Sequence, residues 1–196
     1  MNRAASINGN LVWTKGNILI SNFTFDGKRE QGEDVFFIKE YPSGLNLFFD
    51  QNQSVEELKF EIPQGNYTKI EISYKTHGDQ DDKHIKVEGT YQNTINSTTY
   101  PVVFEFEAEE YYSIVAKTSA GNTQVTLDKD KASYVIIKTD PAYWFQAVST
   151  NMMDNADISI VNSVQTIIIN DSNNEDIYDA VRDRMDDDVT TATFYN

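Results

Sequence analysis

The sequence predicts a mostly β fold, an antiparallel β-sandwich of the immunoglobulin-like or transthyretin-like kind with one or two short helices in its C-terminal quarter. Apolar and polar residues alternate in many short segments, which is the two-residue period of a strand with one buried face. Turn-forming residues separate these segments at intervals of about 8–12 residues, a spacing typical of sandwiches and barrels. Strands and helices do not alternate regularly along the chain, so a doubly wound parallel sheet is not expected.

The N-terminal third is expected to form short strands joined by turns. Residues 11–14 and 18–25 are rich in β-formers, and the triplet Lys15, Gly16 and Asn17 between them predicts a turn. Residues 35–38 and 45–49 flank a second expected turn at residues 41–44. Residues 58–62 then alternate apolar and charged side chains before a break at residues 63–66.

The middle of the chain shows the clearest alternation. Residues 70–75 and 85–88 each place apolar side chains at every second position, and a polar loop, residues 77–84, separates them. Two strands joined in this way predict a β-hairpin. Further strands are expected at residues 104–107, 114–116, 125–127 and 134–137.

The last quarter predicts helices. Asp140 can cap a short helix that begins at Pro141, because proline lacks only an N–H that would be unpaired at that position. Asn173 or Asn174 can cap a second helix, whose Ile177, Val181 and Met185 are spaced four apart and share one face. Residues 190–195 form a β-prone tail. We therefore expect one domain over residues 1–196, with a helix-containing elaboration from about residue 140.

Composition excludes several classes of partner. The net charge is −15, from 31 acidic and 16 basic residues, so nucleic acid and anionic lipid would be repelled. No apolar run approaches the roughly 20 residues that span a bilayer. The chain has no cysteine, which excludes disulfides, thiolate nucleophiles and cysteine-ligated zinc. This fits the cytosol or a secreted protein without disulfides, and we expect the second, with any signal peptide already removed.

The common catalytic signatures are missing from the sequence. It contains no nucleophile elbow, phosphate-binding loop, dinucleotide fingerprint or zinc-protease motif. Both histidines flank an acidic loop, whereas the histidine of a catalytic triad is held by a buried carboxylate. The same loop is the best candidate for a metal site, and its possible ligands are His77, Asp79, Asp81, Asp82 and His84. Its carboxylates suit calcium and its imidazoles suit a transition metal, and no other cofactor is expected.

Two other acidic clusters and one aromatic group are candidate sites. Asp154, Asn155 and Asp157 follow the first predicted helix, and residues 186–188 end the last helix, where carboxylates oppose the helix dipole. Exposed aromatic side chains could stack on sugars, and the residues we select for that role are Trp13, Tyr143 and Trp144.

The order of several segments resembles a known group of proteins. EIPQGNYTKIEISYK at residues 61–75 precedes IKVEGTY at 85–91, YPVVFEFE at 100–107 and DPAYWF at 140–145. This series is similar to that of uncharacterised secreted or lipoprotein β-sandwich proteins of Bacteroidota-type bacteria. The resemblance implies a periplasmic or outer-membrane surface location, often with a lipid anchor on a cysteine that this sequence lacks. It implies no catalytic residues.

Three functions agree with these observations. The first is a non-enzymatic cell-surface or periplasmic binding or adhesion module for a glycan or a protein partner. The second is a carbohydrate hydrolase that works through two carboxyl groups with separated pKa values. The third is a fimbrial or adhesin subunit whose tail, residues 190–195, adds a strand to a neighbour's sheet.

Overall fold

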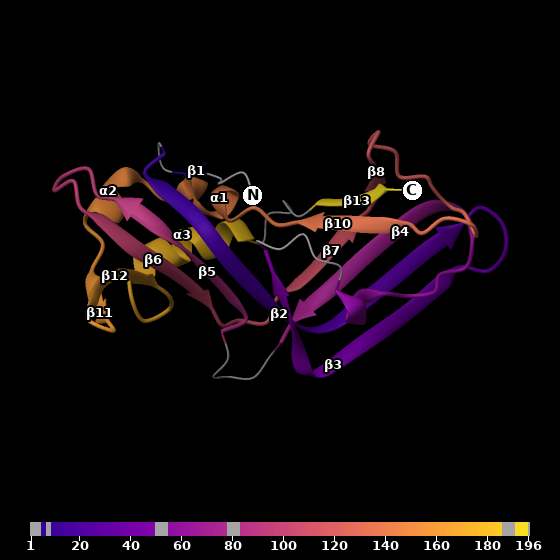
Figure 1. Ribbon diagram of the computed structural model, residues 1–196, viewed down its shortest axis with the longest axis horizontal. Helices are drawn as coiled ribbons and strands as arrows, with labels where there is room; N and C mark the ends of the chain where they lie inside the picture. Colours follow the sequence, from indigo (N-terminus) through magenta and orange to yellow (C-terminus); the bar gives the residue numbers. More distant parts are fainter. Residues whose placement is uncertain (1–4, 7–8, 50–54, 78–82, 186–190, 196) are drawn as a thin grey trace.

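The structure, a computed structural model, describes residues 5–6, 9–49, 55–77, 83–185 and 191–195. Within these residues the protein is mostly β, as predicted, and its helices are short and lie late in the chain (Figure 1). The strands are β1 (Ala5–Ser6), β2 (Leu11–Arg29), β3 (Val35–Phe48), β4 (Gly65–Thr76), β5 (Ile85–Gln92), β6 (Thr99–Phe106), β7 (Tyr111–Val115), β8 (Lys117–Thr118), β9 (Val125–Leu127), β10 (Tyr134–Lys138), β11 (Ile158–Val161), β12 (Val164–Ile169) and β13 (Thr191–Tyr195). The helices are α1 (Pro141–Trp144), α2 (Thr150–Asp154) and α3 (Glu175–Met185), with 3-10 turns η1 (Glu56–Leu58) and η2 (Phe145–Ala147).

The strands form one large sheet and one small sheet. The large sheet has the order β11-β12-β6-β5-β2-β4-β7, with β1 and β3 paired to β2 and β9 paired to β4. The small sheet has the order β10-β13-β8. All pairings are antiparallel except β12 with β6 and β13 with β8. In Figure 1 the helices gather over one half of the large sheet, and the small sheet lies beside the other half.

The strand β2 runs through both halves and contains no turn. The expected turn at Lys15, Gly16 and Asn17 is wrong, because the register slips by one residue between Trp13 and Lys15 while pairing with β5 continues. A β-bulge of this kind keeps a strand extended and re-aims the side chains that follow it. Glycine fits at position 16 because a Cβ there would lie 2.7 Å from Cδ2 of Phe49.

The predicted hairpin between residues 70–75 and 85–88 is also wrong. Strand β4 pairs with residues 20–29 of β2, and β5 pairs with residues 11–18 of the same strand, so the two lie end to end. Leu19 lies at their junction, where its N–H donates to the carbonyl of His84 at 2.7 Å and its carbonyl accepts from the N–H of His77 at 2.9 Å. Both strands therefore pair with the same long edge of β2 and not with each other.

The second expected turn is an irregularity within β3. Ile20 pairs with Leu45 and Asn22 pairs with Glu40, so residues 41–44 lie opposite Ser21 alone. The chain loops locally and then resumes pairing with the same edge of β2. The segments 35–38 and 45–49 therefore lie along the same edge of β2 and do not form two separate strands of the sheet.

The predicted helices are confirmed and cover the half of the sheet that contains β5 and β6. The Asp140 side chain accepts from the N–H of Ala142 at 3.0 Å, which caps α1 with Pro141 at its first position. Phe145 is fully buried, and its ring centroid lies 4.7 Å from that of Trp13 and 5.5 Å from that of Phe104. Ile177, Val181 and Met185 of α3 are all buried, as their spacing predicted.

The C-terminal tail is a strand, as predicted, but both of its edges are paired within this chain. Strand β13 lies between β10 and β8, and its Ala192 and Phe194 are buried. Aromatic stacking fills the core on this half of the large sheet, where the rings of Phe25 and Phe37 lie 5.4 Å apart. The version of the adhesin hypothesis that donates this tail to a neighbour would require β13 to leave its own sheet.

We predict that Phe145→Ala lowers the free energy of unfolding by about 3–5 kcal/mol, because it leaves a cavity where the Phe145 ring packs between the helices and the sheet. Urea unfolding followed by circular dichroism measures the loss. The matched control is Ile95→Ala, since Ile95 is 73% exposed, and it should change stability by less than about 0.5 kcal/mol. A similar small loss in Phe145→Ala would show that the helices do not pack on the sheet as described.

Candidate functional site

The large sheet has an inner face, which carries the core, and an outer face, which carries polar side chains. Residues that lie opposite each other in register point to the same face of a sheet. Phe25 pairs with Phe37 and Ile72 on the inner face, and the neighbouring pairs therefore point outward. Four adjacent strands, β3, β2, β4 and β7, form the outer face in the half beside the small sheet.

The register arranges this outer face in three rows, which we call the platform. Each row takes one residue from each of β3, β2, β4 and β7 in turn. The rows are Phe36, Asp26, Glu71 and Val115; Ile38, Thr24, Ser73 and Ser113; and Glu40, Asn22, Lys75 and Tyr111. Phe36 and Ile38 on one side and Tyr111 and Val115 on the other are apolar or aromatic, whereas the remaining side chains are polar and form a stripe that includes Glu40 and Ser113 at its ends.

The side chains at the two sides of the platform are open to solvent. Phe36 is 62% exposed, Ile38 is 54% exposed and Tyr111 is 62% exposed. Neighbouring strands lie about 4.8 Å apart, so the three spacings from β3 to β7 span roughly 14 Å. Phe36 and Tyr111 also stand two rows apart, about 14 Å along the strands, so their positions are separated diagonally by about 20 Å. An aromatic ring can stack on an apolar ligand face, and a tyrosine also offers a hydroxyl group. Two such rings separated by hydroxyl groups suit an extended polyhydroxylated ligand.

The polar stripe is held by a chain of hydrogen bonds. The Ser73 hydroxyl donates to Oγ of Ser113 at 3.2 Å, and the Ser113 hydroxyl donates to Oε1 of Glu71 at 2.5 Å. The Lys69 ammonium binds Oε2 of the same carboxylate at 2.5 Å. These contacts from Lys69 and Ser113 lower the pKa of Glu71 below its ordinary value, although partial burial acts in the opposite direction.

Asp26, Glu71 and Lys75 of the platform are each paired with an opposite charge within the protein. Lys28 lies 3.1 Å from a carboxylate oxygen of Asp26 and 3.3 Å from one of Asp34. Lys75 lies 2.7 Å from a carboxylate oxygen of Glu109. Local neutralisation on a chain of net charge −15 makes this surface suited to a neutral ligand rather than to a strongly cationic one.

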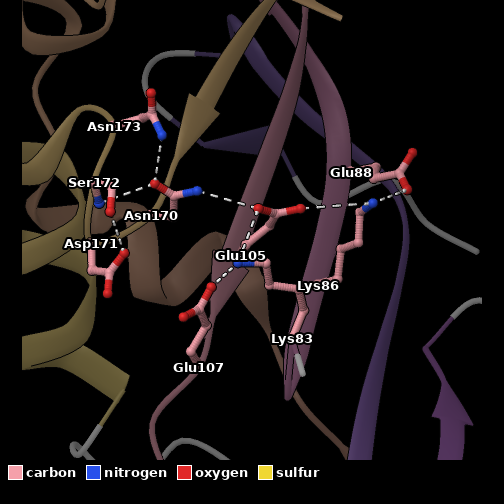
Figure 2. Close-up of polar contacts among 9 residues, drawn as sticks. All are labelled: Lys83, Lys86, Glu88, Glu105, Glu107, Asn170, Asp171, Ser172 and Asn173. Carbon is pink, nitrogen blue, oxygen red and sulfur yellow. Dashed lines mark hydrogen bonds and ion pairs between the residues drawn. The ribbon is translucent and has the colours of Figure 1, made fainter. Parts of the chain in front are cut away.

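The outer face in the other half of the sheet is a ladder of alternating charges (Figure 2). Lys86 lies 3.6 Å from Glu88 and 3.9 Å from Glu105, and Lys83 contacts Glu105 and Glu107. The Asn170 amide also donates to Glu105 at 3.3 Å. Figure 2 shows these side chains pointing toward one another. Because they satisfy each other, this ladder serves cross-strand pairing better than ligand binding.

A polar cavity of about 460 Å³ lies between α2 and the start of α3. Amides and carboxylates line it, including Asn151, Asn155, Asp157, Glu175 and Asp176. Glu175 and Asp176 stand in the first turn of α3, where negative charge stabilises the helix. The cavity contains no aromatic side chain, so it lacks the stacking surface that the platform provides.

The structure places the three predicted sugar-stacking residues away from the platform. Trp13 is 5% exposed and Trp144 is 3% exposed, so both belong to the core between sheet and helices. Tyr143 is half-buried, and the guanidinium of Arg184 lies 4.3 Å from its ring centroid. Neither tryptophan presents a ring face to a ligand. The exposed rings of Phe36 and Tyr111 were not selected from the sequence.

The proposed metal loop is described only at its ends. Asp79, Asp81 and Asp82 lie outside the described residues. His84 is buried, with Nδ1 2.9 Å from the carbonyl of Ala108, and His77 is half-buried beside Leu19. Among the residues that the structure describes, no group of three or more histidine and acidic side chains could hold a metal ion.

The acidic cluster after the first helix has a structural role in the fold. The Asp154 carboxylate accepts from the Tyr91 hydroxyl at 2.8 Å and from the N–H of Thr94 at 2.8 Å. Burial opposes ionisation of Asp154, but the bonds from Thr94 and Tyr91 outweigh it and lower its pKa. Burial, together with the hydrogen bond to Asp154, raises the pKa of Tyr91. The residues 186–188 of the other predicted cluster lie outside the described residues.

Comparison of the chain with protein-family models, curated proteins and solved structures gives no match. The resemblance to Bacteroidota-type secreted proteins therefore remains an expectation from the sequence. Within the described part of the chain, none of the helices combines the length and apolar character needed to cross a membrane.

We predict that Glu71→Gln destabilises the protein at pH 7 by no more than about 1 kcal/mol, because the ion pair with Lys69 is partly exposed. The folded-state pKa of Glu71 is lowered, so its contribution is present above the unfolded value and is lost as the pH falls below it. Urea unfolding should therefore show a difference from wild type at pH 7 that is smaller at pH 3.

The control for this experiment is Glu61→Gln, which removes the same charge from an exposed side chain. It should have little effect at either pH. A Glu71→Gln difference that grows as the pH falls would contradict the hydrogen-bonded arrangement of the stripe.

Proposed function

We propose that the protein is a non-enzymatic glycan-binding module and that an oligosaccharide lies across the platform. The observation that carries this proposal is the placement of the exposed Phe36 and Tyr111 on opposite sides of a hydroxyl- and carboxylate-bearing stripe. Each ring offers an apolar face to one end of the sugar chain. Ser113 and Glu71 lie beneath it, where hydroxyl and carboxylate groups can exchange hydrogen bonds with sugar hydroxyls, and the buried Ser73 supports them by donating to Ser113.

The charges favour a neutral glycan. The carboxylates Asp26 and Glu71 each have a lysine partner, so a ligand need not supply a cation to balance them. An anionic glycan would meet the field of a chain whose net charge is −15. The ionised state of Glu71 keeps it an acceptor of hydrogen bonds at neutral pH, because its pKa is lowered.

The proposed setting is the periplasm or the outer-membrane surface. It rests on the sequence resemblance given above and on a composition without cysteine. The more specific assignment to an immunoglobulin-like or transthyretin-like sandwich belongs to the same proposal. Support for it comes from the half of the molecule in which β13 of the small sheet contacts β7 of the large sheet.

The second candidate is a hydrolase, and the cavity between α2 and α3 is where it would act. Asp157, Glu175 and Asp176 supply carboxyl groups at that cavity. Hydrolysis of an oligosaccharide by the purified protein, abolished in Asp157→Asn, would favour this function over simple binding.

We predict that a glycan array identifies a neutral oligosaccharide and that Phe36→Ala and Tyr111→Ala each weaken its binding about threefold to tenfold. An aromatic contact contributes about 0.5–1.5 kcal/mol, and 1.4 kcal/mol corresponds to a factor of ten in affinity. Isothermal titration calorimetry measures the change. Because the platform lies on a pre-formed sheet, neither variant should alter the fold.

The matched control is Tyr134→Ala, because Tyr134 is 59% exposed on β10, outside the platform. It should leave the affinity unchanged. An array without any bound glycan would remove the proposal, and equal losses in all three variants would move the site away from the platform.

A further inference from the structure

The strand β11 forms one edge of the large sheet and exposes apolar side chains. It pairs with β12 on one side and is the last strand in the sheet order (Figure 1). Ile158 is 41% exposed and Ile160 is 66% exposed. An open edge with apolar side chains is a template for pairing with another strand.

This edge carries no charge, although the chain is strongly acidic. Residues 158–170 contain no lysine, arginine, aspartate or glutamate, in a protein whose charged residues make up 24% of the sequence. Soluble proteins usually protect an edge strand with charged side chains or proline. The opposite edge, β3, follows that rule with Lys39, Glu40 and Pro42. The strand β7, at the other end of the sheet order, is uncharged as well, but it contacts β13 of the small sheet. The uncharged edge of β11 has no such neighbour among the element contacts of the described residues.

The hairpin that presents β11 is fixed in place by its surroundings. Ile167 and Ile169 of β12 are buried and pair with Val102 and Phe104 of β6. Asn162 and Ser163 both have positive φ, 49° and 69°, as a tight two-residue hairpin turn requires.

The start of β11 is held by Asn174. Its side-chain oxygen accepts from the N–H of Asp157 at 2.7 Å, and its amide donates to the carbonyl of Ile168 at 2.7 Å. The edge is therefore ordered before any partner arrives, which lowers the entropic cost of pairing.

We propose that β11 pairs with β11 of a second copy of this chain, in an antiparallel two-fold arrangement that continues the sheet across the dimer. Two copies that each carry a net charge of −15 repel each other over most of their surfaces, and an uncharged edge offers a place where they can meet. A two-fold interface is also the commonest symmetry of homo-oligomers.

Keeping the same face of the sheet buried in both copies allows registers that differ by two residues, and we propose the one centred on Ser159. Ser159 then lies opposite its own copy, and Ile158 lies opposite Ile160 of the second copy. Asp157 lies opposite Val161 of the second copy, so the two Asp157 carboxylates stand at opposite ends of the interface. A parallel arrangement would bring them together, which like charges oppose.

The first test is sedimentation velocity combined with light scattering over a range of protein concentrations. Wild type should have twice the monomer mass of 22.4 kDa at high concentration, and Ile160→Lys should raise the dissociation constant of the dimer at least tenfold. The matched control, Ile38→Lys, places the same charge on an exposed isoleucine of the opposite edge strand and should still dimerise.

The second test uses the absence of cysteine from the chain. Ser159→Cys treated with a short bismaleimide should give a covalent dimer, whereas Ser43→Cys on the exposed surface of β3 should not. A wild type that stays monomeric at every concentration overturns the proposal. So does a dimer that survives Ile160→Lys unchanged, or cross-linking of Ser43→Cys as efficient as that of Ser159→Cys. Because Ile158 and Ile160 are not on the platform, glycan binding can fail without affecting either result.

Discussion

The continuity of β2 is the constraint on which the rest of the structure depends. This one strand of 19 residues pairs with β5 along its first part, with β4 along its second part and with β3 along its other edge. Two bulges, after Trp13 and after Ile20, shift the phase of its buried side chains. Without these shifts, a strict two-residue period would turn Ile18 or Phe23 toward solvent. The bulges thus keep one buried face along the entire strand.

The two halves of the sheet bury this common face in different ways. Around β5 and β6, aromatic rings of the helices pack on the sheet, as the contacts of Phe145 with Trp13 and Phe104 show. In the other half, Phe25 and Phe37 stack within the core, and Phe194 of the small sheet is also buried. In both halves the packing covers one face of the sheet and leaves the opposite face toward solvent. That is why the charge ladder and the platform can lie on one surface with different compositions.

The sequence predicted the class of each element better than the way elements pair. The Asp140 cap of α1 and the buried positions of α3 followed from local rules, and the structure confirms them, whereas the side chain of Asn174, an expected cap of α3, bonds to the backbone of Asp157 and Ile168. Lys15, Gly16 and Asn17 are turn residues by composition, but the pairing of β5 with β2 holds them in an extended strand. The hairpin between β4 and β5 failed for a related reason, since pairing partners distant in sequence are not visible in local alternation.

The platform could not be predicted because apolar and polar residues do not alternate in the segments of β3 and β7 that form its two sides. Residues 35–38 are consecutively apolar, and nothing in that run indicates that Phe37 is packed in the core while Phe36 is exposed. Tyr111 and Tyr112 present the same ambiguity on β7. Tryptophan is the usual choice for a sugar-stacking residue, yet Trp13 and Trp144 are needed to fill the space between sheet and helices.

Two edge strands of the large sheet, β3 and β11, have different roles for the same physical reason. At β3, charged residues and a proline oppose further strand pairing, so the exposed rings there are available to a ligand on the face of the sheet. At β11, no charge opposes pairing, and the side chains of Ile158 and Ile160 gain by meeting a matching edge. Pairing through β11 would extend the sheet away from the platform. A dimer formed in this way would therefore present two platforms, and a glycan with repeated units could engage both at once, which raises the apparent affinity without any new contact.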